Sequence, residues 1–176
     1  MGRSISFHDE KKIMNVKKLC TLAISVSLAM VLSFLESLIP PLVAVPGVKV
    51  GISNTVSLFV LYSLGAPSAF LVSVVRVSLS SILFGSTASF IYSFFGAMLS
   101  LAVMTIFKKL GFFSMIGVSV LGGVFHNVGQ IMAAMIVMKS GAIVVYLPPL
   151  LVSGVIAGIL VGLLSGIVLK KVKSYI

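Results

Sequence analysis

Long apolar segments follow one another along the chain and are separated by short polar, glycine-containing or proline-containing breaks. A helix needs about 20 apolar residues to cross a bilayer, and most of these segments come close to that length or exceed it. The pattern predicts an all-α integral membrane protein, built as one bundle of six transmembrane helices behind a polar basic N-terminal tail at residues 1–15. The predicted helices cover residues 16–39, 51–64, 67–84, 87–107, 113–138 and 142–169.

Prolines and glycines change this picture at two places. Residues 41–50 (PLVAVPGVKV) are apolar but contain Pro46 and Gly47, which predicts a long structured loop or a re-entrant segment instead of a helix. The helix that follows this loop is short. Pro148 and Pro149 are expected to kink the first turns of the last helix.

The basic residues are distributed unevenly between the two sides of such a bundle. Positive residues are concentrated in cytoplasmic loops of membrane proteins, so the distribution predicts cytoplasmic N- and C-termini and a multi-pass protein of the cell membrane. With six helices and the N-terminus inside, the inner side receives Arg3, Lys11, Lys12, Lys17, Lys18, Lys108, Lys109, Lys170, Lys171 and Lys173, and the outer side receives Lys49 and Lys139.

The composition excludes several function classes. The chain is 59% hydrophobic and 9% charged, with a mean hydropathy of +1.26, whereas soluble domains have about 25% charged residues. Its only carboxylates are Asp9, Glu10 and Glu36, and Cys20 is its only cysteine. An aspartate-rich magnesium site, a paired-acid glycosidase and a metal site of several cysteines therefore lack their ligands, and no cofactor is predicted. No nucleic-acid-binding motif accompanies the net charge of +10.

Arg76 is the one basic residue that falls inside a predicted span. A guanidinium there costs on the order of 3 kcal/mol unless it faces protein, water or a ligand. Ser73 and Ser80 share its helical stripe, so the three side chains should point inward. Two interpretations stay open: a structural arginine bonded to carbonyls and serines, or a binding site for an anionic group.

The fifth predicted helix carries the densest polar cluster, in the stretch GGVFHNVGQI at residues 122–131. His126 and Gln130 lie four residues apart on a face with small residues, which is typical of a pocket wall. The alternative is that His126, Asn127 and Gln130 only join helices through hydrogen bonds. A single histidine without neighbouring cysteines or carboxylates is a weak indication of a metal site.

Several polar residues are expected in the outer half of the bundle, where they would line a cavity open to the outside beneath the first loop. Glu36 and Lys49 fall on the same side, and each can equally be an ordinary interfacial residue. The expected substrate-binding residues are Asn54, Arg76, Ser80, Tyr92, His126, Asn127, Gln130 and Tyr146.

Small residues form stripes on two helices. Gly154, Gly158, Gly162 and Gly166 are spaced by four, which favours close packing of another helix against the last one. On the first helix, the stripes suit either internal packing or contact with a different subunit. They consist of Ala23 with Ser27, and of Ser25, Ala29 and Ser33.

From residue 15 to residue 173 the chain resembles the Gx transporter family, also called heptaprenyl diphosphate synthase component I. Its helix order, long first loop and short second helix also resemble S-components, the substrate-binding subunits of energy-coupling factor (ECF) vitamin transporters. The family-like strings are PGVKVGISNTVSLF (46–59), RVSLSSILFGS (76–86), SFIYSFFGAMLSL (89–101) and GGVFHNVGQI (122–131).

The resemblance to S-components implies partners. The small residues of the first helix, Ala23, Ser25, Ser27, Ala29 and Ser33, would dock a transmembrane coupling subunit that two cytoplasmic ATPases drive. The chain has no GxxxxGK[ST] motif of its own, so any ATP hydrolysis would belong to those partners. The synthase name does not fit a catalyst, because the chain has one aspartate and prenyl diphosphate synthases bind magnesium through aspartate-rich motifs.

Two functions remain in competition. The first is capture and uptake of a small organic molecule, which the resemblance suggests is related to isoprenoids, quinones or flavins. The second is a non-catalytic scaffold or accessory subunit for prenyl diphosphate synthesis or membrane electron transfer. An intramembrane enzyme is disfavoured, because so few acid and base groups are present.

Overall fold

The computed structural model describes residues 7–38 and 51–173, and side chains from Val16 to Leu38 and from Gly51 to Val172. In these ranges every secondary-structure element is a helix, which confirms the predicted all-α class. Proline and glycine positions separate most of the helices. The elements are α1 (Phe7–Ser37), α2 (Asn54–Ser63), α3 (Ala66–Phe84), α4 (Thr87–Leu110), α5 (Met115–Met138), the 3-10 helix η1 (Gly141–Tyr146) and α6 (Leu147–Lys173).

Five helical segments within the described ranges are long and apolar enough to cross a membrane. The chain is therefore a multi-pass membrane protein. The outward faces of these helices carry large exposed apolar side chains such as Ile82, Ile136 and Val145, as lipid contact requires. The five segments are Val16–Ser37, Ala66–Phe84, Thr87–Leu110, Met115–Met138 and Gly141–Val172.

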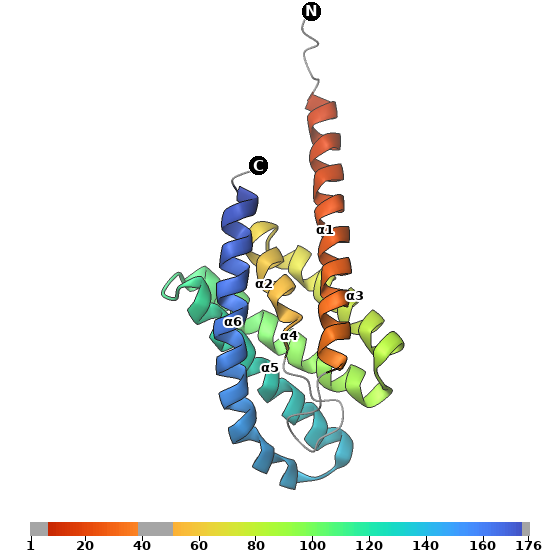
Figure 1. Cartoon of the computed structure of the whole chain (residues 1–176), viewed down its shortest axis with the longest axis vertical. Coiled ribbons are helices and arrows are strands. Elements are labelled where there is room, and N and C mark those ends of the chain that lie inside the picture. The colour runs from red at the N-terminus through yellow and green to blue at the C-terminus, as the bar shows by residue number, and fades with distance from the viewer. Residues whose placement is uncertain (1–6, 39–50, 174–176) are drawn as a thin grey trace, which may run out of the picture.

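The long helices surround α2 (Figure 1). Around the bundle, α1 packs on α3, α3 on α4, α4 on α5 and α5 on α6, while α2 contacts α1, α3, α4 and α6. Leu58 and Val60 of α2 are fully buried, and Leu61 is almost so. The larger of two apolar clusters among the described residues therefore includes α2.

α2 differs from the predicted second span. It has 10 residues, about 15 Å at 1.5 Å per residue, which is half of a hydrocarbon core of about 30 Å. Helix α2 begins late because Gly51 has φ +89°, a left-handed conformation outside a right-handed helix. The first loop, with Pro46, Gly47 and Lys49, lies outside the described residues.

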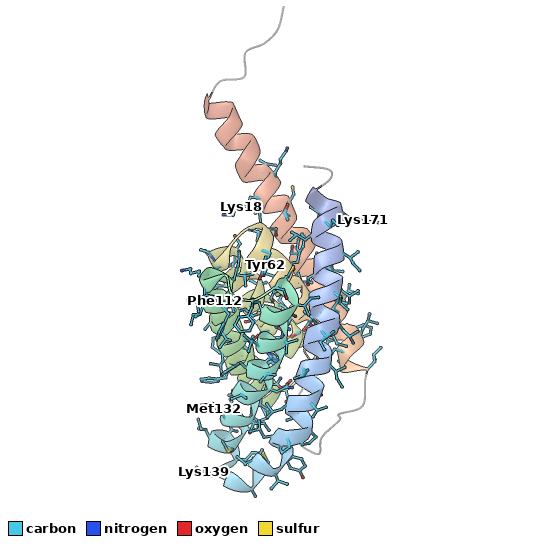
Figure 2. All side chains as sticks on the ribbon, turned by 90° about the vertical axis from the view of Figure 1, so that its left-hand side faces the viewer. Lys18, Tyr62, Phe112, Met132, Lys139 and Lys171 are labelled. Atoms are coloured by element: carbon cyan, nitrogen blue, oxygen red, sulfur yellow. The ribbon has the colours of Figure 1, made fainter. Side chains whose placement is uncertain are left out.

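The two ends of the bundle carry different lysines. Lys18 of α1 and Lys171 of α6 lie toward one end, and Lys139, which follows α5, lies at the other (Figure 2). α1 extends past the other helices at the end with Lys18 (Figure 1). It begins at Phe7, so residues 7–15 continue the helix where a tail was expected. No glycine or proline interrupts the sequence between Phe7 and Ser37, and the segment is rich in helix-forming residues.

The glycine stripe of α6 lies against α5. A Cβ atom on Gly158 would be 2.5 Å from the Cα of Val120, and one on Gly162 would be 2.8 Å from the Cα of Ile116. Such distances require glycine, which confirms internal packing for this part of the stripe. Gly166 has no neighbour within 4 Å at the equivalent point. The two prolines expected to kink the last helix, Pro148 and Pro149, lie in the first turn of α6, directly after η1.

The two small-residue stripes of α1 point in different directions. Ser25, Ala29 and Ser33 are buried inside the bundle, whereas Ala23 and Ser27 are exposed. The first stripe therefore packs within this chain in this conformation. The expected docking role of these residues stays a prediction. The exposed pair remains available for contact with a partner.

Candidate binding site

Arg76 lies in the interior of the bundle, near the middle of α3, with 5% of its surface exposed. Its Nη1 donates a hydrogen bond to Ser53 Oγ, and its Nη2 donates to Asn54 Oδ1 at 3.1 Å. Among the described residues, its Nε has no hydrogen-bond partner. A guanidinium has five N–H groups, so this one retains donors that the described part of the protein does not use.

Glu36, in the last turn of α1, reaches the same place. One carboxylate oxygen accepts a hydrogen bond from the backbone N–H of Gly51, and the other accepts from Ser53 Oγ at 3.2 Å. Its side chain is 5% exposed. Ser53 therefore links the arginine and the carboxylate. We call Glu36, Gly51, Ser53, Asn54 and Arg76 the Arg76 cluster.

The Arg76 cluster surrounds the N-terminus of α2. The first N–H groups of a helix have no partner within it, and the helix dipole places partial positive charge there. Arg76 adds a full positive charge to this end, and Glu36 contributes the one negative charge that the cluster contains. At the other end of α2, Lys108 Nζ donates to the Leu61 carbonyl at 2.6 Å, where a cation is favourable.

His126 and Gln130 of α5 border the Arg76 cluster. The Nε2 atoms of the two side chains are 3.1 Å apart. A Cβ atom on Gly51 would lie 3.0 Å from Asn54 Nδ2 and 3.3 Å from the His126 ring, so this glycine lies between the two groups. In the described part of the chain, His126 Nδ1 and Gln130 Oε1 have no partner.

The helix crossing beside His126 is very close. A Cβ on Gly96 of α4 would lie 2.8 Å from both Gln130 Cγ and the His126 carbonyl oxygen. Adjacent to Gly51 and Asn54 is a small internal cavity of about 10 Å³, room for about one water molecule. Ser100 and Ser119 line it, and neither hydroxyl has a described protein partner. This cavity therefore leaves room for little more than one water molecule beside Gly51 and Asn54.

The structure brings together four of the eight expected substrate-binding residues. Asn54, Arg76, His126 and Gln130 meet at the N-terminus of α2. This meeting point lies near the middle of α3 and α5. The outer-half position of these residues stays a prediction.

The other four expected residues have different neighbours. Ser80 points inward, but its hydroxyl donates to the Val77 carbonyl of its own helix at 3.3 Å. The amide of Asn127 donates to the Leu150 carbonyl of α6. Tyr92 belongs to a separate apolar cluster near η1, and Tyr146 packs against it. The contacts of Asn127 are those of a residue that joins two helices.

Three members of the Arg76 cluster were not among the residues expected to bind substrate: Glu36, Gly51 and Ser53. Glu36 could have been found, because it follows Ser33 by three residues on the stripe of α1 that faces inward. Treated alone, it looked like an interfacial residue. Nothing in the sequence distinguishes Gly51 or Ser53 from other small loop residues.

The chemistry available at this site is hydrogen bonding and charge pairing. No three His, Cys, Asp or Glu side chains within the described ranges are grouped so that they could hold a metal ion. What the site offers a ligand is a set of donors: the Arg76 guanidinium, the His126 ring and the N-terminus of α2. Such a set suits a negatively charged group.

Comparison with known proteins identifies a family. Residues 25–168 match the family described as heptaprenyl diphosphate synthase component I. Neither the search of curated proteins nor the search of solved structures gives a match. The matched range covers most of the chain and includes every residue of the Arg76 cluster. The chain is thus a member of the heptaprenyl diphosphate synthase component I family.

Proposed function

We propose that this protein is a non-catalytic membrane subunit that binds a small organic molecule through its anionic group, at the Arg76 cluster. The observation that carries the proposal is the buried guanidinium of Arg76. Two of its N–H groups have partners, whereas its Nε has none among the described residues. A buried polar group without a partner costs about 1–3 kcal/mol, and a ligand that pairs with it recovers this cost.

Further unpaired polar atoms next to Arg76 support the same reading. His126 Nδ1 and Gln130 Oε1 are both buried and lack described partners. A purely structural arginine needs no such neighbours. Half-length helices whose N-termini meet polar residues at mid-membrane are also typical of transporter binding sites.

The proposed role for the bound molecule is uptake into the cell, with energy supplied by partner ATPases as in S-components. Ala23 and Ser27, on the exposed face of α1, are available for a coupling subunit. In this proposal the protein lies in the cytoplasmic membrane with both termini inside. The ligand is related to isoprenoids, quinones or flavins.

A second candidate follows from the name of the family. Component I of a heptaprenyl diphosphate synthase implies a second component, so the chain can be an accessory membrane subunit that assists a soluble prenyltransferase. On the residues described, it supplies no aspartate-rich magnesium site of its own. In this role the Arg76 cluster would bind the anionic end of a substrate or product of that partner.

Native mass spectrometry of the protein, isolated in mild detergent from its own membrane, tests the proposal. We expect a bound anionic small molecule on the wild type, its loss in Arg76→Gln, and its retention in the matched control Lys109→Gln, which removes an exposed positive charge. Equal retention by both variants would rule out the Arg76 cluster as the binding site.

The same preparation separates the two candidate roles through the proteins that accompany the chain. A coupling subunit with ATPases supports uptake, and a soluble prenyltransferase supports the accessory role. Reconstituted vesicles that contain the copurified ATPases should accumulate the identified molecule only if uptake is the function.

A further inference from the structure

The Arg76 cluster already contains an anion, the carboxylate of Glu36. It accepts hydrogen bonds from Gly51 N–H and from Ser53, which is itself bonded to Arg76. These donors, at the N-terminus of α2, are the ones that would attract an anionic ligand. Glu36 therefore occupies the position in which a ligand's charged group would be most strongly held.

Among the described residues, the cluster has one positive side chain, which is enough to neutralise one anion. Arg76 and Glu36 are the two charged side chains in the cluster, and both are buried. If a ligand anion were added while Glu36 stayed in place, two negative charges would share one guanidinium at low dielectric, which is unfavourable. A ligand anion and Glu36 should therefore compete.

The unused donors show where a ligand could make its first contact. Arg76 Nε and His126 Nδ1 are buried and have no partner in the described part of the chain. His126 is separated from Asn54 only by Gly51, which has no side chain. An anionic group can pair with these atoms and then take over the donors that hold Glu36.

We propose that Glu36 is a resident competitor, which a carboxylate or phosphate group of the ligand displaces from Gly51 and Ser53 when it binds at the N-terminus of α2. This inference rests on the proposed binding function of the Arg76 cluster. It adds a specificity determinant that was not among the expected binding residues. Neutral molecules cannot displace the carboxylate, so the site selects for anions.

Displacement of Glu36 also affects α1. Glu36 lies in the last turn of this helix, and the nearby Phe34 ring packs against Phe84 of α3 with ring centroids 5.1 Å apart. When the carboxylate leaves, the end of α1 loses its hydrogen bonds to Gly51 and Ser53. Ligand binding is then coupled to movement of α1, the helix whose exposed face carries Ala23 and Ser27.

Affinity measurements on charge variants test the proposal. The probes are inorganic phosphate and inorganic diphosphate, titrated by calorimetry into the full-length protein in detergent micelles. Glu36→Gln keeps the side-chain shape but removes the competing charge, so we expect its Kd for diphosphate to be at least tenfold lower than that of the wild type. The matched control Glu10→Gln, which removes a charge from another part of α1, should leave the Kd unchanged, and Arg76→Gln should abolish binding.

The outcomes separate this inference from the proposed function. Loss of binding in Arg76→Gln with an unchanged or weaker affinity in Glu36→Gln would overturn the role of Glu36 and leave the binding site intact. Absence of binding in the wild type and in every variant would overturn both.

A distance measurement keeps the inference testable if Glu36→Gln does not fold. Spin labels at Ser37→Cys and Ser86→Cys, both exposed positions, report the separation of the ends of α1 and α3 in a Cys20→Ser background. Saturating diphosphate should shift or broaden the distance distribution, and Arg76→Gln should prevent this change. An unchanged distribution at saturation would overturn the proposal.

Discussion

A double-mutant cycle on Arg76 and Glu36 tests whether the Arg76 cluster is one coupled electrostatic unit. The single variants are Arg76→Gln and Glu36→Gln, and the third protein carries both changes. Each single change leaves a buried charge without its partner, because the two groups are linked through Ser53 and are each 5% exposed. The double change removes both charges together.

The expected size follows from the geometry. The guanidinium and the carboxylate share one hydroxyl group, that of Ser53. Two unit charges at a separation of about 5 Å attract by about 3 kcal/mol at an effective dielectric constant of about 20. Breaking a buried ion pair costs about 3–5 kcal/mol in proteins, which agrees with this value. Each single variant should therefore lose about 3 kcal/mol of unfolding free energy, and the double variant should lose about 3 kcal/mol less than the sum.

Equilibrium unfolding in mixed micelles, followed by circular dichroism, measures these free energies. The control cycle is Lys109→Gln with Glu10→Gln, which should be additive within about 0.5 kcal/mol, as expected for distant sites. Additive losses for Arg76 and Glu36 as well would refute the coupling. The double variant also separates stability from function, because it should be about as stable as either single variant and still fail to bind an anion.

Three further predictions concern packing and topology. Gly158→Ala places a Cβ 2.5 Å from the α5 backbone and should lower the free energy of unfolding, measured by thermal unfolding, by about 1–3 kcal/mol. The control Gly166→Ala, with no neighbour within 4 Å, should not destabilise the protein. Equal effects of the two changes would contradict the packing of α6 on α5. Asn127→Leu should lower the free energy of unfolding by about 1–2 kcal/mol, because the Asn127 amide donates a hydrogen bond to the Leu150 carbonyl of α6. Ligand retention in native mass spectrometry should be unchanged. Loss of the ligand would instead place Asn127 in the binding site. In a Cys20→Ser background, Ser140→Cys should react with a membrane-impermeant maleimide on intact cells, and reaction only after lysis would reverse the proposed orientation.

The sequence predicted the long helices well, because their apolar lengths are set by the bilayer and their ends by proline, glycine and charge. Helix α4 begins at Thr87, as predicted, and α5 ends at Met138, as predicted. The inward direction of Ser73, Arg76 and Ser80 was also correct, since all three are buried. Helical periodicity alone fixes which residues share such a face.

Depth and partner choice could not be predicted in the same way. Nothing in residues 51–53 (GIS) shows that α2 starts at Asn54, level with Arg76. Glu36 looked interfacial because it lies at the end of an apolar run, yet the start of α2 provides it with two donors. Contacts between segments distant in sequence decide such cases, and one sequence does not encode them in a readable pattern.

An experimental density map of the protein, purified from its own membrane without added ligand, would show directly whether an anion binds at Arg76. We expect density for a small anionic group within hydrogen-bonding distance of Arg76 Nε, beside His126 and the N-terminus of α2. A well-resolved map in which every N–H group of Arg76 is bonded to protein atoms, with no additional density at this position, would contradict it.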